Sequence, residues 1–150
     1  MNILFVCTGN TCRSPMAAAI LKHKAPHISV QSAGVFASDN LPATDQAIKA
    51  MDNKGIQLEH KSQMVTDSLI EWADLVLTMT DQHKQHLQSF FPDYTSKIFS
   101  LVEYTTGEND KNIADPFGGD VALYEATASE IESYIDLLID KVENQRGHKE

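Results

Sequence analysis

Residues 6–15 read V-C-T-G-N-T-C-R-S-P, and the architecture of the chain can be worked out from them. It follows the apolar run 2–6 (N-I-L-F-V), which is typical of a strand buried on both faces, as in a parallel sheet. Its small polar centre predicts a loop. Ser14-Pro15 then predicts the start of a helix, because serine can cap a helix and proline suits its first position. The stretch therefore predicts a strand, a tight loop and a helix in succession.

The rest of the chain continues this alternation of strands and helices. Short apolar runs predict further strands at 28–32, 74–79 and 97–102. Helical spacing of apolar residues, with capping residues, predicts helices at 14–25, 44–54, 66–73, 80–90 and 120–144, and a long polar loop at 106–119. We therefore expect an α/β protein: one domain over residues 1–150, with a four-stranded parallel sheet, helices on both faces and right-handed crossovers. Residues 145–150 are expected to form a frayed tail.

Length and composition exclude several classes of protein. A chain of 150 residues with 42% hydrophobic and 22% charged residues is not disordered, collagen-like or a coiled coil. Its apolar runs, such as Ile3–Cys7, are far shorter than the ~20 residues of a membrane-spanning helix. No secretory signal is visible, so we expect a cytoplasmic protein without a membrane partner, whose two cysteines are reactive or inert thiols.

The charges are distributed unevenly along the chain. A net charge of −9 argues against a nucleic-acid binder. All 21 acidic residues lie from Asp39 onward, whereas the first 38 residues hold only the basic Arg13, Lys22 and Lys24. This asymmetry directs the search for an anion site to the N-terminal segment.

The loop over residues 7–14 has the features of such a site. Ligands of parallel sheets bind beyond the carboxyl ends of the strands, and free backbone N–H groups at a helix N-terminus attract anions there. Gly9 lets the backbone curl inward, and Asn10 is the residue type other than glycine that best tolerates a left-handed conformation. We expect a cradle for a tetrahedral dianion such as phosphate.

Two side chains suggest what the loop does with that anion. The helix dipole and the loop N–H groups would favour a thiolate over a thiol at Cys7, although a cysteine after a strand is often just a small buried residue. Arg13, one of two arginines with Arg146, can grip two phosphoryl oxygens with its planar guanidinium group. Ser14 can cap the helix and also donate to the thiolate. The pattern predicts nucleophilic phosphoryl transfer, with Cys7 as the nucleophile.

Two other phosphate loops do not match this stretch. A Walker-type loop needs G-x-x-x-x-G-K-[ST], and the second glycine and the lysine are missing. A phosphocysteine carrier of a sugar-transport system does not require an arginine at this spacing. Transfer of the phosphoryl group to water is therefore favoured.

A cysteine phosphatase also needs a proton donor for the leaving group. Four carboxyl groups lie in or next to the predicted long loop: Glu108, Asp110, Asp115 and Asp120. Asp115 is favoured because the following proline stiffens it and because apolar neighbours (Ile113, Ala114 and Phe117) would favour its protonated form. An ordinary Asp-Pro turn is the alternative interpretation.

The motif at 7–15 resembles the C-x5-R-[ST] signature of the low-molecular-weight protein tyrosine phosphatase family. The resemblance extends to Q-S-A-G at 31–34, D-P-F at 115–117 and the final helix. More narrowly, the loop resembles the bacterial branch that acts as protein arginine phosphatases. Tyrosine-directed members usually carry a bulky aliphatic residue at the position of Thr11, and a threonine there is associated with phosphoarginine selectivity.

The resemblance implies specific roles for residues of this chain. Cys7, Arg13 and Asp115 would be catalytic, and the phosphate or substrate would contact Thr8, Gly9, Asn10, Thr11, Cys12, Ser14 and Phe117. Asn10, Ser32 and His60 would hold the loop in shape, although Ser32 alone reads as a strand end and His60 as a solvated loop histidine. Cys12 would form a reversible disulfide with Cys7 under oxidation; a small buried residue is the alternative.

The resemblance also sets expectations for the surroundings of the site. The family usually has one or two tyrosines after the Asp-Pro pair, whereas this chain reads D-P-F-G-G and lacks those phosphorylation sites. Phe36 is a candidate for another part of the rim, and a core position is the alternative. His83 and His86 have the spacing of metal ligands, but we expect them on a polar helix face. No metal or cofactor is expected.

Three other functions remain open at this point. A tyrosine phosphatase of the same family is the main alternative to a phosphoarginine phosphatase. An arsenate reductase would need further cysteines for its disulfide relay, and this chain has only Cys7 and Cys12. A module that only binds oxyanions would not need the cysteine, the arginine and the loop carboxylate together. The expected partners are phosphorylated proteins, and the expected state is a monomer.

Overall fold

The computed structural model describes residues 1–149, and the side chains of residues 1–145. Glu150, the last residue of the expected tail, lies outside the described residues, as does the side chain of Arg146. The strands are β1 (Asn2–Cys7), β2 (Ser29–Gly34), β3 (Leu75–Thr78) and β4 (Ile98–Ser100). The helices are α1 (Arg13–Lys24), α2 (Asp45–Asp52), α3 (Asp67–Trp72), α4 (Asp81–Phe90), the 3-10 helix η1 (Pro92–Lys97), α5 (Leu101–Thr106) and α6 (Val121–Lys149).

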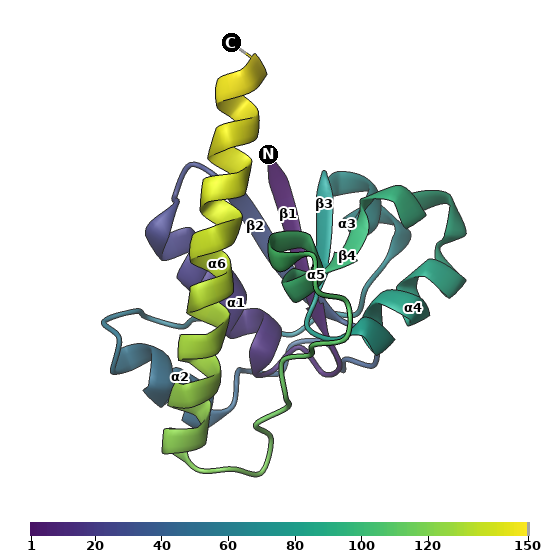
Figure 1. The fold of residues 1–150 in the computed structure, drawn as a ribbon. Coiled ribbons are helices and arrows are strands. Elements are labelled where there is room, and N and C mark those ends of the chain that lie inside the picture. Colours follow the sequence, from purple (N-terminus) through teal and green to yellow (C-terminus); the bar gives the residue numbers. More distant parts are fainter. Residues whose placement is uncertain (150) are drawn as a thin grey trace.

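The four strands form one parallel sheet in the order β2-β1-β3-β4, which confirms the predicted sheet. β1 lies between β2 and β3, where its run of buried apolar residues is covered on both faces. Its last residue, Cys7, pairs with Gly34 of β2. The carboxyl ends of the strands therefore meet at one edge of the sheet, which is the lower edge in Figure 1.

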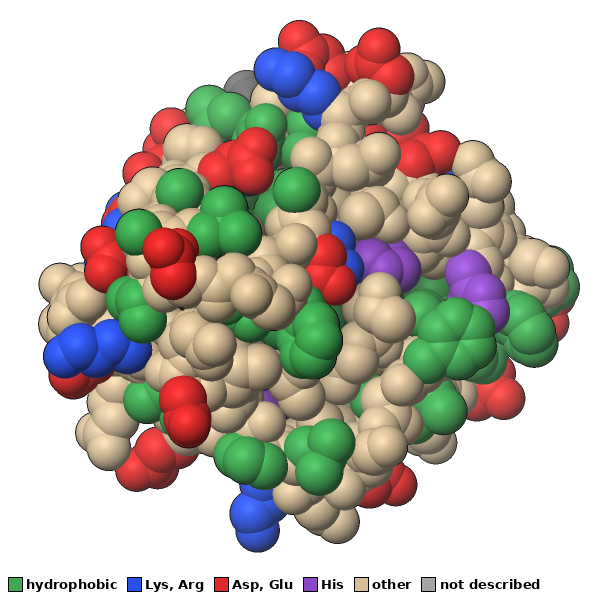
Figure 2. Space-filling view, turned by 90° about the horizontal axis from the view of Figure 1, so that it is seen from below, with side chains coloured by type: hydrophobic (Ala, Val, Ile, Leu, Met, Phe, Trp, Pro, Cys, Tyr) green, Lys and Arg blue, Asp and Glu red, His purple; other side chains and the backbone are tan. Residues whose placement is uncertain are grey.

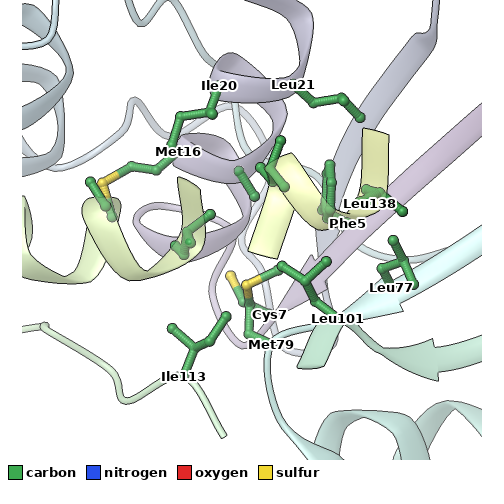
Figure 3. Close-up of a cluster of buried hydrophobic side chains, with 14 of the residues drawn as sticks. Phe5, Cys7, Met16, Ile20, Leu21, Leu77, Met79, Leu101, Ile113 and Leu138 are labelled. Carbon is green, nitrogen blue, oxygen red and sulfur yellow. The ribbon is translucent and has the colours of Figure 1, made fainter. Parts of the chain in front are cut away.

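Helices cover both faces of the sheet, as predicted. Ile3, Phe5 and Cys7 of β1 face a core that also contains side chains of α1, α2, α5 and α6, whereas Leu4 and Val6 face a second core with side chains of α3 and α4. This division follows from the alternation of side chains along a strand. In Figure 3, Phe5 and Cys7 lie among core side chains that include Met16 and Leu138.

The final helix is longer than the sequence predicted. Its apolar positions, Ile131, Ile135, Leu138 and Val142, are fully buried. The helix continues to Lys149 instead of ending at Asn144. Polar contacts hold the turn before Asn144 against the domain: the Lys141 amine donates to the Tyr104 carbonyl at 2.7 Å, and the Glu143 carboxylate lies 2.6 Å from a ring nitrogen of His27. No helix in the described chain is long and apolar enough to cross a lipid bilayer.

Residues 97–106 differ most from the prediction. The strand β4 ends at Ser100, and the last two residues of the predicted strand 97–102 begin the short helix α5, which was not predicted. The Ser100 hydroxyl accepts a hydrogen bond from the Glu103 N–H and so starts the helix. Gly107, at φ 81°, ends it in a left-handed conformation. A short apolar run does not distinguish a strand from a buried helical turn.

Candidate active site

A cavity of about 210 Å³ lies at the carboxyl end of β1. It is lined by residues 7–13, except Asn10, and by Asp115 and Phe117 from the loop before α6. A larger hollow of about 430 Å³ lies between α1 and residues 56–63, and Cys7 and Arg13 do not line it. The smaller cavity is therefore the one that combines the predicted nucleophile, cation and acid.

Cys7 is almost completely buried, and its Sγ lies 2.9 Å from the Ser14 Oγ. The Asn10 Nδ2 donates to that same serine oxygen at 2.8 Å. The one serine hydrogen then has two acceptors within reach, the sulfur at 2.9 Å and the Ala33 carbonyl oxygen at 3.5 Å, and the sulfur is the nearer. The predicted contact between Ser14 and Cys7 is present. The predicted capping role of Ser14 is wrong: α1 begins one residue earlier at Arg13, and its N-cap, Cys12, makes no side-chain capping bond.

Asn10 connects the loop to two other segments, β2 and residues 56–63. Its Nδ2 also donates to the Ser32 Oγ at 2.9 Å, and its Oδ1 accepts from the Gln63 N–H at 3.0 Å. The His60 Nε2 lies 2.6 Å from the Asn10 carbonyl oxygen, and burial lowers the pKa of this ring. A neutral His60 can donate to that carbonyl from its protonated nitrogen. Ser32 and His60 therefore meet the loop where the family resemblance implies.

The tight bend of the loop is at Asn10, whose φ is 57°. Gly9 has no positive φ, and a methyl group there would meet only the Thr11 Oγ1 at 3.8 Å. The glycine that the loop requires is Gly34, which the sequence interpretation gave no role. A Cβ on Gly34 would lie 2.4 Å from the Thr8 carbonyl oxygen and 3.0 Å from the Asn10 nitrogen.

Arg13 is 4% exposed and connects the two walls of the cavity. Its Nη1 donates to the Ile113 carbonyl at 2.8 Å, and its Nη2 lies 3.7 Å from the Asp115 Oδ2. Ile113 is in turn held by its N–H, which donates to the Met79 carbonyl at 3.0 Å. The guanidinium group thus ties the long loop to the loop that follows β1.

Asp115 lies at the mouth of the cavity with its side chain 49% exposed. Its Oδ1 accepts from the Phe117 N–H at 3.0 Å. The expected apolar surroundings are absent, because Ile113 is buried in the core while Ala114 and Phe117 are exposed. Arginine and a backbone N–H hold the carboxyl group instead. The other candidates, Glu108, Asp110 and Asp120, do not line the cavity.

The two candidate rim aromatics are both on the surface. Phe117 is 73% exposed and lines the cavity. Phe36 is also exposed, so a core position is excluded; it packs edge-on against His86, which stacks on Phe90. Figure 2 shows the face at the carboxyl ends of the strands, where hydrophobic, acidic and histidine side chains lie close together.

His83 does not lie on the polar helix face that the sequence predicted for it. It is 7% exposed, and its Nε2 lies 2.8 Å from the Thr8 Oγ1. Burial, and secondarily the charge of Arg13, lowers the pKa of the ring to about 4. The sequence did contain one indication that His83 is buried. His83 and Leu87 are four residues apart, which places them on the same face of the helix, and both face inward. Among the described residues, no three His, Cys, Asp or Glu side chains are grouped closely enough to hold a metal ion.

Cys12 is also buried and lines the same cavity as Cys7. Its Sγ accepts a hydrogen bond from the Tyr124 hydroxyl at 3.8 Å, and burial raises the pKa of its thiol. Both cysteines are free. At neutral pH Cys12 is therefore a protonated thiol in the same loop as Cys7.

A buried cysteine and a buried arginine in one loop at a helix N-terminus, with a carboxylate at the cavity mouth, define a cysteine-dependent phosphatase. The family model for low molecular weight phosphotyrosine protein phosphatase matches residues 2–148, and the chain belongs to this family.

Similar proteins are named after two different substrates: some are protein-arginine-phosphatases and others are protein-tyrosine-phosphatases. A protein-arginine-phosphatase of Bacillus subtilis is 47% identical over 150 residues, covering 97% of this chain and 99% of that protein. A probable low molecular weight protein-tyrosine-phosphatase EpsP of Ralstonia nicotianae is 39% identical, covering 93% and 94%. A structure of the YwlE arginine phosphatase, a C7S mutant with a phosphorylated active site serine, superimposes with a TM-score of 0.94 at 47% identity, covering 97% and 98%.

Proposed function

We propose that this protein removes phosphate from phosphoarginine residues of proteins through a phosphocysteine intermediate. The observation that carries the proposal is the placement of Cys7, Arg13 and Asp115 around one cavity at the start of α1. The arginine specificity is supported by the protein-arginine-phosphatase that is 47% identical over nearly the whole chain. The covalent step is supported by the relative whose active site serine carries a phosphoryl group.

The first half of the reaction forms a bond between sulfur and phosphorus. The Cys7 thiolate, which accepts a hydrogen bond from Ser14, attacks phosphorus in line with the bond to the leaving nitrogen. Arg13 and the backbone N–H groups of residues 8–14 hold the equatorial phosphoryl oxygens and balance their charge. Asp115 protonates the guanidino nitrogen as the P–N bond breaks, and the substrate leaves as an ordinary, positively charged arginine side chain.

The second half of the reaction hydrolyses the phosphocysteine. Asp115 is now a carboxylate, and it takes a proton from the water that attacks phosphorus on the side vacated by the leaving group. The Cys7 thiolate leaves, and inorganic phosphate is released. The hydrogen bond from Arg13 to Ile113 and the ion pair with Asp115 keep the acid next to the phosphate site during both steps.

Thr11 is the residue that we expect to select the substrate. It lines the cavity and is half-buried, and its carbonyl accepts the Thr44 N–H at 3.0 Å, which fixes its backbone. A small polar side chain leaves room at the wall beside the leaving group. A bulky aliphatic side chain would fill that room and present an apolar surface, which suits a phenol ring better than a guanidino group.

Parallel assays on phosphoarginine and phosphotyrosine proteins test the proposal. We expect phosphoarginine to be hydrolysed faster by the natural chain, and the Thr11→Ile variant to shift the ratio toward phosphotyrosine. The Cys7→Ser variant should have no turnover while it still binds oxyanions. A natural chain that prefers phosphotyrosine would favour the second candidate, a tyrosine phosphatase, for which the 39% identity to EpsP is the supporting observation.

Cys12 extends the proposal to redox regulation. Peroxide would convert the Cys7 thiolate to a sulfenic acid, and the Cys12 thiol would displace water from it to form a disulfide. The position of Cys12 five residues after Cys7, in the same loop, supports this role.

Since the nucleophile must stay reduced to work, we place the enzyme in the cytoplasm, where thiols are kept reduced. We expect it to act there as a monomer, which light scattering of the purified protein would test.

A further inference from the structure

We propose that His83 is a positioning residue that holds the Thr8 side chain, so that the Thr8 hydroxyl donates a hydrogen bond to an oxygen of the bound phosphoryl group. The inference deepens the proposed function and rests on it. It adds a donor to the site that neither the loop backbone nor Arg13 supplies.

The contact joins two distant parts of the chain. His83 lies in the first turn of α4, where the Thr80 hydroxyl accepts its N–H at 3.1 Å and so fixes its backbone. Its Nε2 reaches the Thr8 Oγ1 at 2.8 Å, across 75 positions of sequence. The Thr8 carbonyl oxygen accepts the Phe36 N–H at 2.9 Å. Thr8 is therefore held at both its side chain and its backbone.

The position of the imidazole proton decides what Thr8 can do. The Nδ1 of His83 is buried and has no hydrogen-bond partner among the described residues. A buried N–H without an acceptor is less favourable than a buried lone pair without a donor, so the proton belongs on Nε2. Burial, Arg13 and His86 lower the pKa of His83 to about 4 against the opposing charge of Asp115, so the ring is neutral near pH 7.

This assignment leaves the Thr8 hydrogen free. Because the Nε2–H donates to the Thr8 oxygen, the hydroxyl does not need to donate to the ring. Thr8 directly follows Cys7 and lines the cavity, where a phosphoryl oxygen is the acceptor that the substrate brings. A hydrogen bond to a charged oxygen is stronger than one between neutral groups. Thr8 and His83 should therefore contribute to phosphate binding as one unit.

Calorimetric titration with inorganic phosphate tests the inference, because it measures binding without turnover. We expect Thr8→Val and His83→Phe each to weaken phosphate binding about tenfold, and Thr8→Ser to bind as the natural chain does. The double variant Thr8→Val/His83→Phe should bind no more weakly than Thr8→Val, since both changes remove one interaction. The matched control is His86→Asn, three positions along α4, which should leave phosphate binding unchanged.

Three results would overturn the inference. The first is unchanged phosphate affinity in Thr8→Val. The second is a lower melting temperature of His83→Phe with unchanged phosphate affinity, which would make the contact purely structural. The third is a proton on Nδ1 of His83 in ¹⁵N NMR of the natural chain, a measurement that does not depend on any variant folding. A natural chain that binds phosphate as expected but hydrolyses neither phosphoarginine nor phosphotyrosine would contradict the proposed function and leave this inference intact.

Discussion

The hydroxyl oxygen of Ser14 lies 2.9 Å from the sulfur of Cys7, and both residues are buried. The serine oxygen also accepts from Asn10, which in turn binds Ser32 and is contacted by His60. The hydrogen that Ser14 offers to the sulfur is thus oriented by a chain of buried polar groups that begins outside the loop. Such chains act as a unit, so each member affects the nucleophile.

Removal of the serine hydroxyl tests this relationship. In Ser14→Ala the thiolate loses a hydrogen bond, which contributes about 1.5–3 kcal/mol when one partner is charged. With p-nitrophenyl phosphate as the substrate, formation of the phosphocysteine releases a burst of p-nitrophenol. We expect the rate constant of this burst to fall about tenfold or more in stopped-flow measurements. Ser133→Ala, on the exposed side of α6, is the matched control. A burst as fast as that of the natural chain would exclude Ser14 from the first step.

Gly34 supports the loop from below. In Gly34→Ala the new methyl group would overlap the Thr8 carbonyl oxygen, a backbone atom that cannot move without distorting the loop. We expect a loss of stability of about 1–3 kcal/mol in urea denaturation, together with lower turnover. Gly9→Ala, where the methyl group has room, should lose less stability. Equal losses in the two variants would contradict this explanation.

Asp115 has two roles in the proposed reaction. The loss of turnover when its carboxyl group is removed should depend on the leaving group of the substrate. For Asp115→Asn we expect turnover of phosphoarginine to fall about 10²–10⁴-fold. The loss on p-nitrophenyl phosphate should be smaller, because its phenolate leaves with little help from an acid. Asp110→Asn, an exposed residue of the same loop, is the control. Equal losses on both substrates would mean that Asp115 is not the acid.

Oxidation should distinguish the two cysteines. After mild peroxide treatment, we expect mass spectrometry to find a Cys7–Cys12 disulfide in the natural chain, and reductant to restore activity. In Cys12→Ser the same treatment should give irreversible loss and a Cys7 sulfinate. A sulfinate without an internal disulfide in the natural chain would rule out the protective role.

The buried histidine at the loop predicts how stability changes with pH. His83 binds its proton near pH 4 in the folded protein, against an ordinary pKa of 6.5. Between these values the unfolded chain binds more protons, so stability rises with pH and is lost as pH falls from about 6.5 toward 4. The shift corresponds to stability on the order of 3 kcal/mol, and the lowered pKa of His60 acts in the same direction.

Urea denaturation between pH 4 and 7 measures this dependence. His83→Gln should flatten the slope, because it removes the titrating ring and keeps a side chain that can bond to Thr8. His23→Asn, which removes an exposed histidine of α1, shows whether the loss of any histidine has the same effect. An unchanged slope in His83→Gln would place the titrating group elsewhere.

Local features could be predicted because neighbouring residues produce them. The strand Asn2–Cys7, the helix that follows it and the cysteine-to-arginine spacing all depend on contacts within about 20 residues, and the structure agrees with them. The predictions failed where a residue's environment is set by another element. His83 read as solvated because its nearest neighbours in sequence are polar, and Asp115 read as enclosed because its neighbours are apolar.

The order of the residues was enough to predict that a strand, a phosphate-sized loop and a helix follow one another, with a cysteine at one end of the loop and an arginine at the other. Strand alternation and helix capping are short-range effects, so they can be derived from residues in order. The residues that hold that loop are seen only in the folded molecule. Gly34, His60 and His83 reach it from three separate elements, because the parallel sheet brings the carboxyl ends of its strands to one edge.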